Sequence, residues 1–172
     1  FLYDDFAVLA EAYSQAKSLP GGGEPQLNSY QLACIQSMVL YSEGQYFQAA
    51  EVSQIAISQA KESGFVGING PLDAMLVLAR AQLEASDLDN CIQTLNELMN
   101  EGSSWEIWPW YLMAEGTLTR IQISQGAIST GSEAIAKQRA FLSKLHTPNQ
   151  LSWMIDMSEV FLRFATKDWS RA

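Results

Sequence analysis

Apolar residues recur at every third or fourth position along most of this chain, which is the spacing of one buried face of a helix. Two stretches that keep this period are Met75, Leu78, Ala79 and Leu83, and Ile92, Leu95 and Leu98. Segments with the strict alternation and β-branched residues typical of strands are absent from the sequence. The pattern therefore predicts an all-α protein.

A motif of three positions recurs along the chain: a turn residue, a large apolar residue two positions later, and a small residue five positions later. The four copies are Gly44, Tyr46 and Ala49; Ser86, Leu88 and Cys91; Gly126, Ile128 and Gly131; and Lys167, Trp169 and Ala172. Their last members are 42, 40 and 41 residues apart. A small residue is needed where a second helix crosses the first closely, and a large one fills the wedge between them. The spacing predicts repeated helix pairs of about 40 residues each.

Prolines mark where the first helix of each pair begins, because the missing N–H costs little there. They are Pro25, Pro71, Pro109 and Pro148. First helices are expected near residues 27–43, 72–85, 109–125 and 150–166, and second helices near 45–63, 87–100 and 127–145.

The whole chain, residues 1–172, is predicted to be a single helical-repeat domain. It contains full repeats at 27–63, 71–100 and 109–145, a partial repeat at 150–172, and the second helix of a preceding repeat at 3–18. Solenoids end in polar capping helices, and neither end shows one. We therefore expect a piece of a longer superhelix, able to self-associate through its ends.

These units resemble tetratricopeptide repeats, although they exceed the usual length of about 34 residues and lack the Trp and Leu-Gly signature of the first helix. The repeat length and segment 44–50 (Gly-Gln-Tyr-Phe-Gln-Ala-Ala) are similar to the superhelical sensor region of LuxR-type, MalT-like bacterial transcription regulators. In that family an ATPase core precedes this region, and a helix-turn-helix DNA-binding domain follows it.

The resemblance implies a right-handed α-α superhelix and a non-catalytic sensor module. Such a module binds a protein partner or small-molecule effector in a concave groove. The alternative is a stand-alone tetratricopeptide scaffold or adaptor that binds a peptide or a protein.

The resemblance also implies that first helices line the groove, at positions counted back from each turn residue. The groove candidates are Met38, Tyr41, Arg80, Leu83, Arg120, Ile123, Met157 and Phe161. They predict a mostly apolar groove with Arg80 and Arg120 one repeat apart, suited to an elongated ligand bearing carboxylate, phosphate or hydroxyl groups. The alternative is that each arginine pairs with a glutamate on its own helix, Glu84 or Glu115.

Composition and charge argue against several other functions. The chain has 10 Lys and Arg against 19 Asp and Glu, a net charge of −9, so it repels nucleic-acid phosphates. No apolar run reaches the roughly 20 residues that cross a bilayer. His146 is the only histidine, and its place at the end of a second helix suits a cation better than a general base. No catalytic residue, metal site or cofactor is predicted, and the chain is not expected to be an enzyme.

Two cysteines and a tryptophan cluster complete the set of candidate residues. Cys34 and Cys91 lie in apolar-periodic segments without Cys-x-x-Cys spacing, so two buried reduced thiols are favoured over a disulfide. Reduced thiols favour a cytoplasmic location. Trp105, Trp108 and Trp110 are expected to fill a junction between units, and stacking on a sugar or a partner is the alternative.

Overall fold

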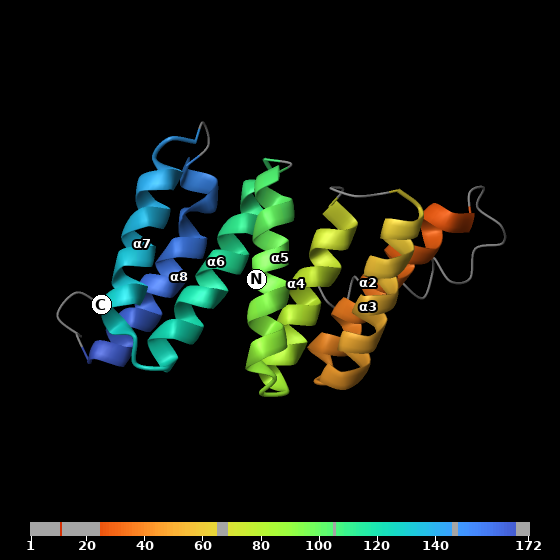
Figure 1. Cartoon of the computed structure of the whole chain (residues 1–172), viewed down its shortest axis with the longest axis horizontal. Helices are drawn as coiled ribbons and strands as arrows, with labels where there is room; N and C mark the ends of the chain where they lie inside the picture. Colours follow the sequence, from red (N-terminus) through yellow and green to blue (C-terminus); the bar gives the residue numbers. More distant parts are fainter. Residues whose placement is uncertain (1–10, 12–24, 65–68, 105, 146–147, 168–172) are drawn as a thin grey trace. The chain divides into compact units, whose positions relative to one another are not determined.

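The computed structural model describes residues 11, 25–64, 69–104, 106–145 and 148–167, and these contain seven helices and no strand (Figure 1). The helices are α2 (Pro25–Ser42), α3 (Tyr46–Glu62), α4 (Asn69–Glu84), α5 (Leu88–Ser104), α6 (Trp108–Ser124), α7 (Ile128–Leu142) and α8 (Pro148–Thr166). The all-α prediction is confirmed for this part of the chain. Each of the seven expected helices has a counterpart whose ends lie within four residues of the predicted ones. The helix expected at 3–18 lies outside the described residues.

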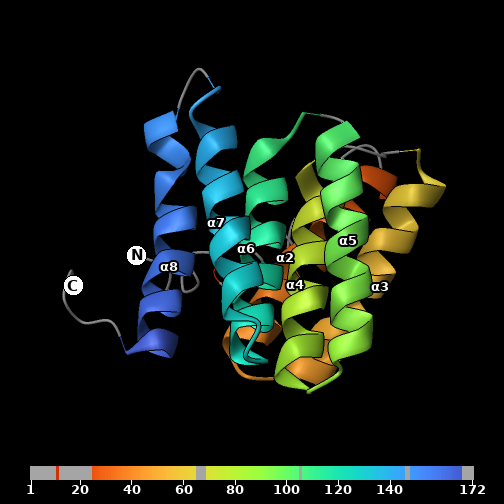
Figure 2. The same cartoon turned by 60° about the vertical axis from the view of Figure 1, so that its left-hand side comes forward.

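The chain divides into two compact units, residues 1–105 (unit 1) and 106–172 (unit 2). In unit 1, α4 packs against α2, α3 and α5, and α2 also packs against α3. In unit 2, each of α6, α7 and α8 contacts the other two. Consecutive helices within each unit are therefore packed neighbours (Figure 2). The predicted single domain and its superhelical arrangement stay predictions.

The four predicted turn residues share a left-handed backbone conformation, which commonly ends a helix. Their φ angles are 76° at Gly44, 60° at Ser86, 87° at Gly126 and 56° at Lys167. The Gly44 N–H donates to the Tyr41 carbonyl (3.0 Å), and the next N–H donates to the Leu40 carbonyl (2.9 Å). The same pair of bonds closes α4 and α6. Ser86 adopts this conformation although only glycine reaches it without a steric cost. The position of the turn therefore follows from the spacing of the apolar residues and does not require a glycine.

The small residues that follow the turns lie in tight packing. Ala49 and Cys91 are 0% exposed, and Gly131 is also buried. A Cβ atom added to Gly131 would collide with Cγ1 of Ile123, on the preceding helix. Position 131 therefore carries no side chain because Ile123 occupies that space.

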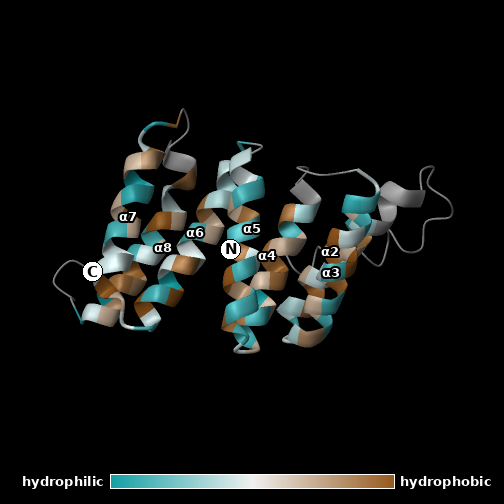
Figure 3. Ribbon diagram, viewed as in Figure 1, coloured by the Kyte–Doolittle hydropathy of each residue, from teal (hydrophilic) through white to brown (hydrophobic). Residues whose placement is uncertain are grey.

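Helix α4 is buried all around its circumference. Its core residues are Leu72, Ala74, Met75, Leu76, Val77, Leu78, Ala79 and Ala81. Successive residues of a helix point in directions about 100° apart, so this run places buried residues on every side of α4. By contrast, α5 is amphipathic, with hydrophilic residues along much of its length in Figure 3. None of the described helices is long and apolar enough to span a membrane.

Candidate functional site

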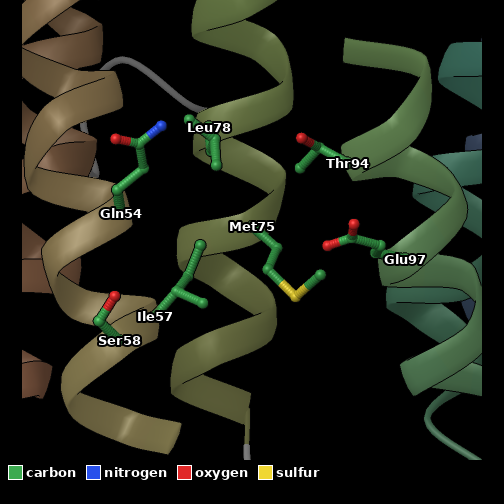
Figure 4. A pocket seen from close by; sticks show the side chains of 7 residues that line it. All are labelled: Gln54, Ile57, Ser58, Met75, Leu78, Thr94 and Glu97. Atoms are coloured by element: carbon green, nitrogen blue, oxygen red, sulfur yellow. The ribbon is translucent and has the colours of Figure 1, made fainter. Parts of the chain in front are cut away.

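A groove of about 320 Å³ opens on unit 1, above α4 and between α3 and α5 (Figure 4). Its floor is apolar and consists of Met75 and Leu78 from α4 with Ile57 from α3. Its rim is polar and consists of Gln54, Ser58, Thr94 and Glu97. This volume lies at the lower end of the range for small-molecule sites and accommodates a single long side chain.

The rim side chains of the groove converge from two helices. Glu97 of α5 extends its carboxylate toward α4, and Gln54 of α3 turns its amide nitrogen to the α4 side (Figure 4). The Glu97 carboxylate accepts a hydrogen bond from Nε2 of Gln93 (3.0 Å). Glu97 is exposed, and a carboxylate offers about four acceptor positions, so it can accept further donors. The groove thus presents a negative charge beside an apolar floor.

The two units carry very different charge. Residues 1–105 contain thirteen acidic and three basic residues, a net charge of −10. Residues 106–172 contain six acidic and seven basic residues, a net charge of +1. The acidity of the whole chain is therefore a property of unit 1, which holds the groove.

Unit 2 contains an ion-pair network between α7 and α8. Nη2 of Arg139 lies 2.7 Å from Asp156 Oδ1 and 2.5 Å from Glu159 Oε2. Nη2 of Arg163 lies 2.5 Å from the other carboxylate oxygen of Glu159. Hydrogen bonds from Arg139 and then Arg163 hold the pKa of Glu159 below its usual value of 4.5. The network therefore favours the ionised carboxylate in the folded chain.

The network occupies the same register as the groove floor. Counted from the turn residues, the equivalent positions are Ile57 and Arg139, Met75 and Asp156, and Leu78 and Glu159. Ile57 and Arg139 each stand 13 residues after a turn residue, Gly44 or Gly126. The other two pairs stand 11 and 8 residues before the next turn residue, Ser86 or Lys167. One contact between a second helix and the next first helix is thus apolar in unit 1 and ionic in unit 2.

Neither the groove nor the network was predicted, because only positions on the first helices were counted. The sequence does contain the pattern. Three apolar residues in unit 1 and three charged residues in unit 2 stand at identical distances from the turn residues. Comparing the copies position by position along the second helices would have found it.

Among the described residues, no ion pair joins Arg80 to Glu84. Arg120 donates from Nη2 to Thr117 Oγ1 (3.1 Å) and from Nε to the Gly116 carbonyl (3.4 Å), both on its own helix. Arg80 lies half-buried on α4 in unit 1. Because the two arginines belong to different units, their alignment along one groove stays a prediction.

The other predicted groove residues divide into three environments. Met38 and Tyr41 are half-buried and pack against the core cluster of Ala49, Val77 and Ala81. Leu83 is also half-buried. Ile123 is 2% exposed and belongs to the core of unit 2, so it presents no surface to a ligand. The last two, on α8, are exposed.

Helix α8 exposes an apolar face, which we call the α8 outer face. It consists of Trp153, Met157, Val160, Phe161 and Phe164, between 39% and 58% exposed. Four of these residues follow one another at intervals of 4, 3 and 4, the spacing of a seam between packed helices. The opposite side of α8 is buried, with Ile155 and Ser158 at 0% and 1% exposure. Thus α8 is apolar on two opposite sides.

The equivalent face of α6 is covered by its neighbours in unit 2. Its residues are Leu112, Gly116, Thr119, Arg120 and Ile123, all buried or half-buried. Ser158 Oγ of α8 lies 3.4 Å from the Gly116 carbonyl, and Gln138 of α7 donates to Thr119 Oγ1 (3.1 Å). Two neighbouring helices thus cover on α6 the positions that are open on α8.

The cysteines are free and buried, as predicted. Burial raises the pKa of Cys34 to about 12 and that of Cys91 to about 11. Neither forms a thiolate near neutral pH, and the thiolate is the reactive form. Among the described residues, no group of three or more His, Cys, Asp or Glu side chains could hold a metal ion.

Trp108 packs inside unit 2. Its ring lies 4.9 Å from Phe141 of α7 and 6.1 Å from Tyr111, both edge-on. Trp108 therefore joins α6 to α7 within one repeat, and the expected packing of the tryptophan cluster between repeats stays a prediction. Trp105 and His146 lie outside the described residues.

No family model, curated protein or solved structure matches this chain.

Proposed function

We propose that this chain is a non-catalytic, tetratricopeptide-like binding module that receives an amphipathic helix of a protein partner on the α8 outer face. The observation that carries the proposal is the exposed apolar seam, with its intervals of 4, 3 and 4. A helix that is apolar on opposite sides suits a position between two packed neighbours. The covered face of α6 is the precedent within the chain, since helices cover the same register positions there.

The chemistry of the α8 outer face suits a helical ligand. Trp153, Phe161 and Phe164 are aromatic, and aromatic side chains supply much of the binding energy at protein interfaces. Fully burying one large apolar side chain contributes about 1.5–3 kcal/mol. A partner helix with its own apolar seam would cover all five residues at once, which is the helix-in-groove mode of recognition.

The proposed architecture is a right-handed superhelix of helix pairs of about 40 residues. Support comes from the left-handed turn residues, which recur 42, 40 and 41 positions apart. The proposed wider role, sensing in a cytoplasmic LuxR-type regulator, is supported by the sequence resemblance. A stand-alone adaptor is the alternative, and the α8 outer face serves either.

A helical-peptide display library with apolar residues at intervals of 4, 3 and 4 tests the function. The double variant Met157→Glu with Phe164→Glu places two charges in the seam and should abolish selection of binders. The matched control, Ser132→Glu with Ala136→Glu, places two charges at exposed positions of α7 and should retain them.

Two outcomes would contradict the proposal. One is a library that yields no peptide able to distinguish the parent from the seam variant. The other is a parent chain that sediments as a dimer while the seam variant sediments as a monomer. That second result would assign the α8 outer face to a second copy of the chain.

A further inference from the structure

The groove between α3 and α5 lies on the strongly acidic unit. Among the described residues of unit 1, only Lys61 and Arg80 are basic, and neither lines the groove. The net charge of −10 on unit 1 attracts cations over a range of about 10 Å at ordinary ionic strength. Of the residues lining the groove, Glu97 alone is charged. The groove thus combines a local anion with an acidic surrounding.

Unit 2 fills the equivalent place with its own cation. There Arg139 stands at the register of Ile57 and spans to two carboxylates of α8. In unit 1 the position of Arg139 is occupied by Ile57, and the carboxylate that lines the groove belongs to Glu97 of α5. The contact between a second helix and the next first helix therefore accommodates a guanidinium group in one unit and leaves an open groove in the other.

We propose that this groove binds an arginine side chain presented by a basic peptide segment of a partner protein. Its alkyl stem lies over Met75 and Leu78, since arginine stems pack on apolar surfaces while the charged head stays at the polar edge. Its guanidinium donates to the Glu97 carboxylate of α5. A planar fork with five donors can make two parallel hydrogen bonds to one carboxylate, whereas a lysine ammonium is a point charge.

Free arginine, a polyamine and a basic peptide all carry positive charge, but they differ in how much of unit 1 they can contact. Free arginine offers the same guanidinium group without a flanking peptide, and a polyamine offers only ammonium groups. A peptide adds neighbouring basic residues, which meet the other exposed acidic side chains of α3 and α5, among them Glu51, Glu62 and Asp89. The charge of the whole unit therefore favours a basic peptide over a single small cation.

The test uses a fluorescein-labelled peptide of alternating arginine and serine, with a lysine–serine peptide of equal length for comparison. Binding is measured by fluorescence anisotropy at low and high salt. The parent chain should bind the arginine peptide more tightly than the lysine peptide, and salt should weaken both. Glu97→Gln should weaken the arginine peptide by about five-fold, the upper range for an exposed ion pair.

Two matched variants separate the groove from the general charge of unit 1. Glu84→Gln removes one exposed carboxylate at the end of α4, outside the groove, and should change affinity far less than Glu97→Gln. Ile57→Arg supplies the groove with an internal guanidinium, as Arg139 does in unit 2, and should compete with the peptide. Circular dichroism confirms that each variant retains its helix content.

Three results would overturn the proposal. The first is an equal loss of affinity in Glu97→Gln and Glu84→Gln, which reduces the effect to net charge. The second is unchanged binding by Ile57→Arg. The third is binding of free arginine amide as tight as that of the peptide, which would assign the groove to a small cation.

Discussion

The contact between α3 and α4 in unit 1 and the contact between α7 and α8 in unit 2 use the same register positions for opposite chemistry. Ile57, Met75 and Leu78 make the first contact apolar, while the second joins Arg139 to two carboxylates of α8. The helix ends and turns that place these positions are nearly identical. The backbone therefore specifies where the helices meet, and the side chains at that place are free to differ.

The two contacts stabilise their units in different ways. Burial of an apolar side chain contributes about 1.5–3 kcal/mol and depends little on salt or pH. Ion pairs whose side chains are 29% to 54% exposed contribute about 0.2–1 kcal/mol each and weaken in salt. Unit 1 thus gains more stability from its apolar contact. The stability that unit 2 gains from its ionic contact depends more strongly on salt and pH.

The largest expected effect comes from truncating equivalent positions. Leu78→Ala should lower the free energy of unfolding by about 2–3 kcal/mol, because it removes a buried side chain beside the groove. Glu159→Ala, at the equivalent position of α8, should lower it by about 1 kcal/mol. Urea denaturation of both variants measures the difference. Equal losses would show that the two contacts do not differ as described.

A second comparison concerns the small residues after the turns. Ala49→Leu should overpack unit 1 and cost about 1–3 kcal/mol. Gly131→Ala should cost about 1–2 kcal/mol in unit 2, because the new methyl group displaces Ile123. Helix propensity alone predicts the opposite sign for Gly131→Ala, a gain of about 1 kcal/mol. Thermal melts decide between the signs, and a stabilised Gly131→Ala variant would refute the close approach.

The pH dependence should follow the ion-pair network. The pKa of Glu159 is lowered by Arg139 and Arg163, so its stabilising contribution is complete above the ordinary value of 4.5 and is lost as pH falls below it. Glu115 has the opposite sign, since burial raises its pKa and its contribution is lost as pH rises. Between pH 6 and pH 3, Glu159→Gln should lose less stability than the parent. Parallel pH profiles for the two proteins would contradict this assignment.

The smallest effect is expected from salt. Raising the ionic strength from low values to about 1 M shortens the screening length to about 3 Å and should cost the parent a few tenths of a kcal/mol through its exposed ion pairs. Arg139→Gln should show a smaller loss, since it lacks the central cation. The matched variant Ile57→Val leaves the network intact and should respond to salt as the parent does.

The sequence by itself determined the helices and their turns. Apolar period, prolines and small residues gave helix ends within four residues. The turn positions were predicted even at Ser86 and Lys167, where no glycine marks them. These features are local, because a helix and its end are decided by hydrogen bonds and packing among residues close in sequence.

Only the tertiary structure decided which apolar and charged positions are open to a partner. The helical period identifies Ile123 and Phe161 equally as apolar, yet one is buried in the core and the other is exposed. The period also does not predict the hydrogen bonds that Arg120 makes within its own helix, or the groove beside Glu97. Exposure depends on which neighbouring helix covers a face, and that neighbour can lie tens of residues away in the chain, as Ser158 does from Gly116.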